Sequence, residues 1–544
     1  MNKKRLFYIV LIILLHLIFV LSSIDKPFMG DEVIFIKTAN SIVETGSPVF
    51  NYNFMNTKDE GLFHPPIYIY LLSMLIRFLG SSEISLRLLS ILFNVGVILL
   101  VYFLSLFLLG KENEKWALLA IAFYALNPLT IQSSIILDMD GGVLNFFTLL
   151  FAFLFVKGKN SIYLILSFLL VLWTKFTGVV IIIGALFFYS LIYWNLKDLK
   201  KNLFIIGSGI ALFLFQFLLY TSFLGLRFMT PFEHSSILNH IHEIIKNTTS
   251  TVSRSIWSVK LFFYFAVPFF ILLFFILSYY FIKNKNYKQH KEITFVWLMG
   301  MITILFFLFI GPTGWNFPKY YITALPFISI FSAFMLQKLK VKIDKKDFAW
   351  IVILLIVIPI YLFFTLGDPL IPEIQLISGV TSFSAVISAM STRLWLYFVA
   401  PIIIGIFVMY KSKTKNKFII LLCVLTFTLY LYIGIIQATA SYSTHNLYGT
   451  QGIRGVVSYF QDRNISSENI ATYPDIGYYL GYNRYYDLTF VYNDEVRLDE
   501  WVLNNEKVEY IVMLEKDFSR IGEENLGSFE GIKQIGDYYI LKRK

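Results

Sequence analysis

The sequence is poor in cysteine and in charge, and each scarcity excludes a class of protein. Its single cysteine, Cys423, lies inside an apolar run, so neither a disulfide within the chain nor a metal site built from several cysteines is available. Only 15% of the 544 residues are charged. A soluble chain of this length could not cover its apolar surface with so little charge, which excludes an ordinary water-soluble protein.

Apolar and aromatic residues take the place of charge. Hydrophobic residues make up 57% of the chain and aromatic residues 18%, and the mean hydropathy is +0.68. The net charge is +11, but most lysines lie in short loops between apolar runs. The positive-inside rule for membrane proteins accounts for them better than nucleic-acid binding does. We therefore expect a membrane protein whose partners include membrane lipids and no nucleic acid.

Apolar runs long enough to cross a hydrocarbon core of about 30 Å recur along the chain. The first follows Lys3, Lys4 and Arg5 and is similar to a signal peptide, but no small-residue cleavage site follows it, so we interpret it as a retained span. The runs at 141–156 and 161–174 are short, and a re-entrant hairpin at 161–194 is an alternative. We expect about 13 spans, near residues 6–23, 86–109, 116–136, 141–156, 161–174, 176–194, 203–224, 259–281, 293–310, 319–337, 348–366, 395–410 and 418–436.

The charge of the loops orients these spans. If the basic loops are cytoplasmic, the N-terminus is cytoplasmic and the tail from Ser441 onward is extracytoplasmic. This orientation requires the apolar stretch 65–80 to lie in the membrane interface as a helix, because a span there would turn every later basic loop outward. The short basic loops lie around 111–115, 157–159, 197–201, 283–291, 338–346 and 411–417, and the longer, lysine-poor loops at 24–85, 225–258 and 367–393.

The composition changes at about residue 441. Charged residues become more frequent, and apolar residues come in short runs. Segments typical of helices, at 453–460 and 498–504, alternate with segments typical of strands, at 470–473, 508–514 and 534–541. The sequence therefore predicts two domains: an all-α membrane domain over 1–440, whose first outer loop 24–85 carries interfacial helices, and a small extracytoplasmic α/β domain over 441–544.

Two acidic clusters fall on the same, extracytoplasmic side of this topology. One is Asp31-Glu32 after the first span, and the other is Asp138 and Asp140 in the run Asp-Met-Asp-Gly-Gly before the span at 141–156. Ionisable groups at membrane depth are costly and call for a functional hypothesis. Paired carboxylates can act as a general base or hold a divalent cation. The structural alternatives are a helix cap for Asp31 and a solvated turn for the second cluster.

Polar and basic residues accompany the acids on that side. His64 precedes Pro65-Pro66 and has a structural hydrogen bond as its alternative role. Arg87, Lys175 and Lys319 each lie at the outer end of an apolar run, where snorkelling to the interface is the alternative. Because three cations and two acid clusters share one face, we expect a site that binds a phosphate and removes a proton.

Taken in order, these motifs resemble the GT-C glycosyltransferases, in particular the protein O-mannosyltransferase group and the lipid A aminoarabinose transferases. The resemblance covers roughly residues 1–340. The matching pieces are Gly30-Asp31-Glu32; His64-Pro65-Pro66-Ile67-Tyr68; Leu79-Gly80 with Ser85-Leu86-Arg87-Leu88-Leu89-Ser90; Asn127-Pro128-Leu129 leading to Asp140; Trp173-Thr174-Lys175 with Gly178; and Lys319-Tyr320-Tyr321 with Ala324-Leu325-Pro326.

The resemblance implies a multi-pass enzyme of the cell membrane whose donor is a sugar on a polyprenyl phosphate, such as dolichyl phosphate. It implies Asp31 as the catalytic base, Glu32 as its neighbour in the acceptor site and Asp140 as a further catalytic acid. Substrate contacts would come from His64, Arg87, Asp138, Lys175, Lys319 and Tyr320. No cofactor is then required, although Asp138 and Asp140 leave a divalent cation as an option.

The sequence departs from the family pattern at several points, and these departures limit which family properties can be expected of this chain. Ile135 stands about where the family has a basic residue before the second acid. The tail does not resemble the beta-trefoil insert of the eukaryotic protein mannosyltransferases, so the acceptor is open among protein, lipid and glycan. The chain also has no Trp-Trp-Asp-Tyr-Gly run, which the oligosaccharyltransferase branch carries, so transfer of a whole glycan is not expected.

The expected reaction is a single, inverting displacement in which Asp31 takes the proton of an acceptor hydroxyl. The cations would neutralise the departing phosphate. The rival class is a polytopic transporter or a flippase for lipid-linked glycans, which would place its binding residues at mid-membrane. A weaker alternative is a polymerase or ligase of surface polysaccharide.

Overall fold

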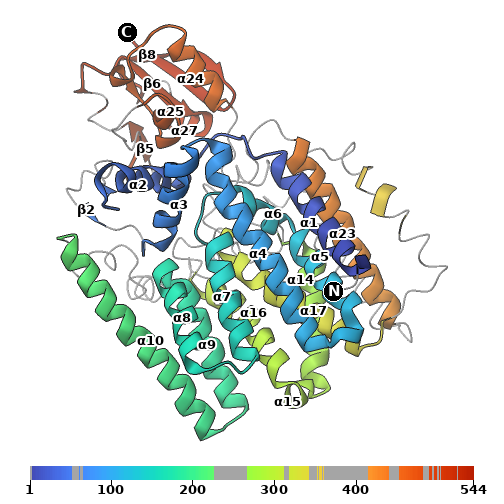
Figure 1. Ribbon diagram of the computed structural model, residues 1–544. Coiled ribbons are helices and arrows are strands. Elements are labelled where there is room, and N and C mark those ends of the chain that lie inside the picture. The colour runs from blue at the N-terminus through green and yellow to red at the C-terminus, as the bar shows by residue number, and fades with distance from the viewer. Residues whose placement is uncertain are drawn as a thin grey trace. The chain divides into compact units, whose positions relative to one another are not determined.

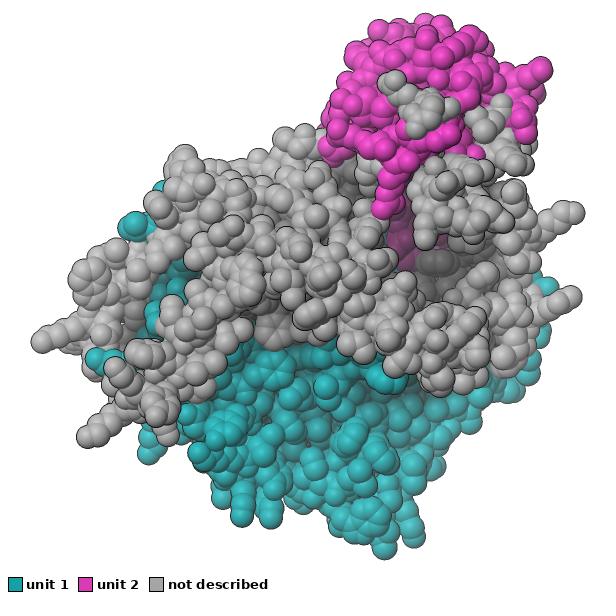
Figure 2. Space-filling view, turned by 180° about the vertical axis from the view of Figure 1, so that it is seen from behind, with its two compact units in different colours: residues 1–24, 64–68, 87–439 teal, residues 25–63, 69–86, 440–544 magenta. Residues whose placement is uncertain are grey.

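The computed structural model describes residues 3–48, 50–51, 60–61, 65–225, 266–310, 318–341, 415–439, 452–481, 489–492, 495–498, 504–522 and 525–544, together with positions 352, 355–357, 359–360 and 502 (Figure 1). The chain divides into two compact units (Figure 2). Unit 1 comprises Met1–Ile24, His64–Tyr68 and Arg87–Thr439, and unit 2 comprises Asp25–Phe63, Ile69–Leu86 and Ala440–Lys544. The second unit thus takes most of the first loop as well as the C-terminal segment.

Unit 1 is a bundle of apolar helices. In chain order they are α1 (Lys3–Leu21), α4 (Glu83–Leu109, whose first turn belongs to unit 2), α5 (Glu114–Ala125), α6 (Pro128–Ile135), α7 (Gly142–Val156), α8 (Ser161–Thr174), α9 (Phe176–Ile192), α10 (Leu196–Phe223), α14 (Pro268–Lys283), α15 (Asn286–Gln289), α16 (Lys291–Ile310), α17 (Leu325–Lys338) and α23 (Lys415–Thr439), with 3₁₀ turns η2 (Lys111–Asn113) and η4 (Pro318–Ala324).

The helices match a multi-pass membrane protein. Within the described residues, six helices are long and apolar enough to cross a membrane, or up to seven if one bent pair counts as a single span. Five more apolar helices are shorter. The expected spans at 348–366 and 395–410 fall almost wholly outside the described residues, as does the start of the one at 259–281. The expected total of about 13 spans therefore stays a prediction.

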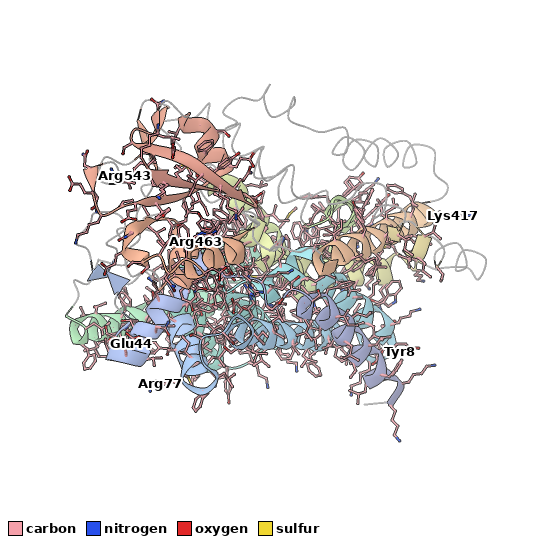
Figure 3. All side chains as sticks on the ribbon, turned by 90° about the horizontal axis from the view of Figure 1, so that it is seen from above. Tyr8, Glu44, Arg77, Lys417, Arg463 and Arg543 are labelled. Atoms are coloured by element: carbon pink, nitrogen blue, oxygen red, sulfur yellow. The ribbon has the colours of Figure 1, made fainter. Side chains whose placement is uncertain are left out.

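Burial separates the centre of the bundle from its rim. Every residue of α17 from Leu325 to Leu336 is buried, and α17 packs against α5 and α16. On α10, by contrast, large apolar side chains face outward, with Phe223 88% exposed, as lipid contact requires. The helices α1 and α23, on which Figure 3 labels Tyr8 and Lys417, pack together. Gly434 on α23 makes this possible, since a Cβ there would meet the Phe19 ring at 3.1 Å.

The span expected over 116–136 is not continuous. Helices α5 and α6 meet at a bend of 60°. Asn127 caps α6, its side chain accepting the backbone N–H of Leu129, and Pro128 occupies the first turn, where its missing N–H costs nothing. The amide of Asn127 also donates to the carbonyl of Ala266 and to the Tyr430 hydroxyl. The cap thus satisfies the Leu129 N–H at the start of α6, and the other two bonds satisfy the buried amide of Asn127 itself.

One smaller difference concerns a helix start. Helix α10 begins at Leu196, capped by Asn195, so the lysines at 197, 200 and 201 belong to its first turns and not to a loop. The 65–80 stretch does form a helix, α3 (Ile67–Leu79), which is short for a span. Its predicted place in the membrane interface stays a prediction.

In unit 2 the first loop supplies α2 (Asp31–Thr45), a strand pair β1 (Phe50–Asn51) and β2 (Glu60–Gly61), and most of α3. The C-terminal segment supplies α24 (Ile453–Gln461), a 3₁₀ turn η7 (Ser467–Asn469), β3 (Ile470–Ala471), α25 (Pro474–Tyr479), β4 (Thr489–Tyr492), β5 (Glu495–Leu498), β6 (Tyr510–Leu514), α27 (Glu515–Ile521), β7 (Phe529–Ile535) and β8 (Tyr538–Arg543).

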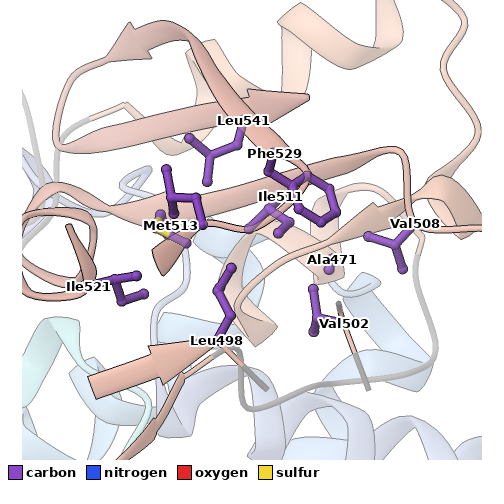
Figure 4. Close-up of a cluster of buried hydrophobic side chains, with 10 residues drawn as sticks. Ala471, Leu498, Val502, Val508, Ile511, Met513, Ile521, Phe529 and Leu541 are labelled. Carbon is purple, nitrogen blue, oxygen red and sulfur yellow. The ribbon is translucent and has the colours of Figure 1, made fainter. Parts of the chain in front are cut away.

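The C-terminal segment folds as a small α/β structure, as the sequence predicts. Its sheet has the order β3-β6-β8-β7, with β3 parallel to β6 and the other pairs antiparallel. One apolar core includes Ile511, Met513 and Leu541 (Figure 4), and a second includes Val512 and Ile540. Because neighbouring residues of one strand enter different cores, both faces of the sheet are covered.

Two element predictions in this segment are wrong in detail. The single strand expected over 534–541 is a hairpin, because Gly536 adopts a positive φ of 58° and β7 ends at Ile535 before β8 starts at Tyr538. The helix expected from Leu498 does not begin there, since Leu498 ends β5.

Candidate functional site

The second acidic cluster forms a buried turn between α6 and α7. The side chains of Asp138 and Asp140 are 5% and 2% exposed, and Oδ1 of Asp138 accepts the backbone N–H of Asp140 at 3.0 Å. This Asx-type bond fixes the two carboxylates relative to each other. Burying two carboxylates costs several kcal/mol unless each is paired.

Two lysines supply the pairing. Nζ of Lys175 lies 2.6 Å from Oδ2 of Asp140, and Nζ of Lys319 lies 2.6 Å from Oδ2 of Asp138. Lys175 sits in extended conformation at the break between α8 and α9, and Lys319 lies in η4 before α17. Both lysines were predicted to be at the site, and the structure brings them together with the second acid pair. Snorkelling does not describe Lys175, because it is only 6% exposed.

The ring of Tyr320 lies beside both ammonium groups. Nζ of Lys175 is 4.9 Å and Nζ of Lys319 is 5.5 Å from its centroid, within the range of cation–π attraction. Tyr320 in turn stacks on Phe307 of α16, with the centroids 5.5 Å apart. Two cations, two anions and one aromatic face thus form a compact cluster, which we call the lysine–aspartate cluster (Asp138, Asp140, Lys175, Lys319 and Tyr320).

Asp138 and Asp140 differ in how easily they take a proton. Burial pushes the pKa of Asp138 upward, but the charges of Lys319 and Lys175 and the Asp140 N–H outweigh it and hold that pKa well below its usual range. Burial raises the pKa of Asp140 to about 6, with the charge of Asp138 adding to the effect and Lys175 opposing it. Asp140 is therefore the carboxylate that gives up its charge first.

The two glycines after Asp140 let the turn approach its neighbours. A Cβ on Gly141 would lie 2.8 Å from Cβ of Ser133, and one on Gly142 would lie 3.0 Å from the carbonyl oxygen of Ser90 on α4. Larger residues would therefore push the turn away from α4 and α6. The Asp-Met-Asp-Gly-Gly run combines charged groups with the close packing that places them.

A buried polar network supports the turn, and the sequence reasoning missed it. The Tyr124 hydroxyl and the Ser133 hydroxyl both donate to Oδ1 of Asn94, at 3.0 and 3.1 Å, and Asn145 donates to the Tyr124 oxygen. Ser90 bonds the carbonyl of Ile136, just ahead of the turn. The available signal was the pair of polar residues at 90 and 94 inside an apolar run, one helical turn apart.

His16 bridges the break in the broken span. It is fully buried in α1; its Nδ1 lies 2.7 Å from the carbonyl oxygen of Ala125 at the end of α5, and its Nε2 lies 3.0 Å from Oγ of Ser134 on α6. One imidazole therefore contacts both sides of the bend that leads to Asp138.

Arg87 has a structural contact of its own. Its side chain is fully buried, so it does not snorkel, and its guanidinium donates to the carbonyl oxygen of Ile24 at 2.8 Å. That bond fixes the end of the segment that follows α1. The predicted contact of Arg87 with a phosphate stays a prediction.

The first acidic pair begins α2 in unit 2. The cap position is Gly30, with a positive φ of 54°, so Asp31 occupies the first helical turn and is not the cap that we considered. Asp31 is exposed, whereas Glu32 is 2% exposed and its Oε2 accepts the backbone N–H of Met29 at 2.9 Å. The exposed carboxylate of Asp31 is thus mounted on a rigid helix start.

The contacts described above do not test the remaining predictions about the site. Because Asp31 and Glu32 belong to unit 2 and the lysine–aspartate cluster to unit 1, their meeting in one site stays a prediction. His64 lies outside the described residues. Among the side chains that the structure describes, no three His, Cys, Asp or Glu residues gather as metal ligands would.

Comparisons with known proteins agree with the motifs. Residues 63–220 match the family model described as dolichyl-phosphate-mannose-protein mannosyltransferase. An uncharacterized protein of Aquifex aeolicus (strain VF5) is 25% identical over 395 residues, which cover 69% of this chain and 73% of that protein.

Solved structures share the fold. ArnT from Cupriavidus metallidurans bound to undecaprenyl phosphate aligns over 99% of this chain and 98% of its own, with a TM-score of 0.54 at 13% identity. The same protein in the apo state aligns with a TM-score of 0.50 at 12% identity. The predicted resemblance to GT-C glycosyltransferases is confirmed as a resemblance, by the matching family model and by the shared fold, and the apolar helices are those of a multi-pass membrane protein.

Proposed function

We propose that this protein is an integral membrane glycosyltransferase that moves a sugar from a polyprenyl-phosphate carrier to a hydroxyl group of an acceptor on the extracytoplasmic face. The observation that carries the proposal is the lysine–aspartate cluster, in which the buried ammonium group of Lys175 and the partly buried one of Lys319 lie beside one Tyr320 ring. The matching family model and the shared fold of a protein that binds undecaprenyl phosphate support the same reading.

The cluster suits a phosphate that must leave. When the bond between the anomeric carbon and the phosphate oxygen breaks, the oxygen keeps the electron pair and gains negative charge. Ammonium groups in a water-poor site stabilise that charge strongly. Lys175 and Lys319 both lie within 5.5 Å of the Tyr320 ring centre, so we place the departing phosphate beside that ring.

The aspartates keep the lysines in place until the donor arrives. In the structure each ammonium group is neutralised by one carboxylate. A bound phosphate brings a further negative charge, so one carboxylate must yield its lysine or take a proton. Asp140 is the natural one to do so, because its pKa is raised to about 6. Donor binding and proton uptake at Asp140 are then coupled.

In this proposal Asp31 activates the acceptor hydroxyl. As the hydroxyl oxygen attacks the anomeric carbon from the side opposite the phosphate, Asp31 takes its proton, and the single displacement inverts the anomeric configuration. Glu32 lies beside it, and we include His64 and Arg87 among the residues that complete the substrate site. The sugar is a hexose or pentose, and the acceptor is a protein, a lipid or a glycan.

No metal is needed for this scheme. Both carboxylates that could hold a divalent cation already contact a lysine, and an ammonium group at that distance repels a second cation. The lysines can supply the charge that a metal would otherwise bring to the phosphate.

The test is to incubate the purified full-length protein in lipid nanodiscs with a panel of polyprenyl-phosphate sugars and to measure release of the free carrier phosphate. Lys319→Met should lower the rate by about 10²-fold or more, and Asp31→Asn should abolish transfer without affecting membrane insertion. Lys200→Met, at an exposed position of α10, is the matched control and should retain the rate. A transporter or flippase would move the lipid-linked sugar across the bilayer without releasing the phosphate, and that outcome would reject the proposal.

A further inference from the structure

The segment just before Asp31 is held by the C-terminal part of unit 2. The backbone N–H of Phe28 donates to the Tyr479 hydroxyl at 2.8 Å. The Phe28 ring is fully buried and meets the Tyr478 ring edge to face, with the centroids 5.9 Å apart. Tyr478 and Tyr479 end helix α25, so this contact joins residues more than 400 positions apart in the sequence.

Met29 goes further and becomes part of the C-terminal core. Its side chain is 3% exposed and packs in one apolar cluster with Ile453 and Val456 of α24 and Ile476 of α25. Burying this side chain removes apolar surface from water, which stabilises the core. The core on this side of the sheet is therefore completed by a residue of the first loop.

From Met29 the connection to the acidic pair is short. The Met29 N–H donates to Oε2 of Glu32, and the Glu32 N–H donates back to the Met29 carbonyl at 3.2 Å. Only Gly30 stands between Met29 and Asp31, in a positive-φ conformation that few other residues adopt without strain. Movement of Met29 is therefore transmitted to the start of α2.

The Tyr479 hydroxyl also joins this segment to the start of α4. While it accepts from Phe28, it donates to Oε1 of Glu83 at 2.8 Å. Arg454 of α24 lies 3.9 Å from the same Glu83 oxygen and donates to the carbonyl oxygen of Asp25. Residues 25–29 are thus fixed at several points by two helices of the C-terminal segment.

We propose that the C-terminal α/β domain is the positioning element of the Asp31-Glu32 pair, and that Tyr479 and Met29 are the residues through which it acts. This inference rests on the proposed function, in which Asp31 is the base. It assigns the domain a part in the transfer step itself. The contrasting role, a module that only selects acceptors, becomes an outcome of the test.

The experiment compares Tyr479→Phe with Tyr539→Phe in the full-length protein. Both substitutions remove one hydroxyl from the same domain, but the Tyr539 ring stacks on Phe518 at the other core. We measure hydrogen exchange of the backbone amides of residues 28–33, and kcat and the donor KM for release of the carrier phosphate. Tyr479→Phe should speed exchange of that segment by about 3- to 10-fold, the value of one or two hydrogen bonds. It should lower kcat by a similar factor and leave the donor KM unchanged, because the proposed phosphate contacts are elsewhere.

Met29 provides a second, independent pair of variants. Met29→Leu keeps the volume and should retain kcat, whereas Met29→Ala opens a cavity and should lower kcat without changing the donor KM. If Met29→Ala does not fold, the comparison of Met29→Leu with wild type and of the two tyrosine variants still decides the matter.

Three results would overturn the inference. They are unchanged exchange at residues 28–33 in Tyr479→Phe, faster exchange with unchanged kcat, and a rise of the acceptor KM alone, which would make the domain an acceptor-selecting module. Absence of transfer by the wild-type protein with every donor would instead reject the proposed function. The exchange data would then still decide whether the domain holds this segment.

Discussion

The buried pair of Lys175 and Asp140 offers the sharpest test of the cluster. Removing one partner leaves the other charge in a site where the side chains are only 8% and 2% exposed. We expect Lys175→Met to lower the free energy of unfolding by about 3–5 kcal/mol. Asp140→Asn should cost somewhat less, because Asp138 also acts on Lys175 and remains to offset its charge.

The double variant Lys175→Met/Asp140→Asn should be more stable than either single one. With no uncompensated charge left, its free energy of unfolding should return to within about 1–2 kcal/mol of wild type, so the loss in the double variant should be several kcal/mol smaller than the sum of the two single losses. Sodium dodecyl sulfate titration of the protein in mixed micelles, followed by circular dichroism, measures these values. An exposed lysine gives the control: Lys200 of α10 should cost about 0.5 kcal/mol or less when changed to Met.

Stability and transfer should separate in the double variant. It regains the fold but lacks the ammonium group, so release of the carrier phosphate should stay as low as in Lys175→Met. If the two single losses simply add in the double variant, the charges are not coupled and the pairing argument fails. If the double variant transfers at the wild-type rate, Lys175 does not act on the phosphate.

Three further outcomes follow from the site. Gly142→Ala should lower the free energy of unfolding by about 1–3 kcal/mol through overpacking against α4 and should reduce transfer; thermal unfolding in detergent and the carrier-release assay measure the two effects, and a stable, fully active variant would contradict the close approach. Asp140, with a pKa raised to about 6, is ionised above that pH and protonated below it, so the donor KM should fall as the pH is lowered from 8 through 6, because protonation frees Lys175 for the phosphate. Asp140→Asn should remove that pH dependence, and a KM that rises in acid would have the wrong sign. Treatment with EDTA should leave the rate unchanged, whereas a loss restored by Mg²⁺ or Mn²⁺ would require a metal at Asp138 and Asp140.

Sequence reasoning located the charged parts of the cluster but not their pairing. Asp138, Asp140, Lys175 and Lys319 stand out because charge at the ends of apolar runs is expensive and few residues carry it. Which lysine meets which aspartate depends on how α7, α8 and α17 pack, and Lys319 reaches a carboxylate 181 positions away. The pattern of polar residues within one helix does not show which lysine pairs with which aspartate.

The sequence indicated some of the helix breaks and turns. Pro128 signalled the start of α6, but an apolar run on both sides of it led us to expect one span. The Gly536-Asp537 pair marked the hairpin between β7 and β8, yet the continuous β-branched and aromatic pattern favoured a single strand. At both places a residue that interrupts regular structure decided the outcome, although the hydrophobic pattern around it was continuous.

The joining of Met29 to the C-terminal core could not be read from the sequence at all. A methionine after an apolar span is ordinary, and its partners at 453, 456 and 476 lie at the far end of the chain. The predicted domain over 441–544 therefore leaves out Met29, which completes its core.

That core has a consequence for how the protein is made. Met29 is synthesised more than 400 residues before α24 and α25, the helices that receive it, and the described helices of unit 1 from α4 onward are made in between. A chain that stops short of residue 453 has no place to bury Met29 and no tyrosine to hold Phe28. An unfinished copy therefore lacks the contacts that hold the start of α2, where the proposed base Asp31 lies.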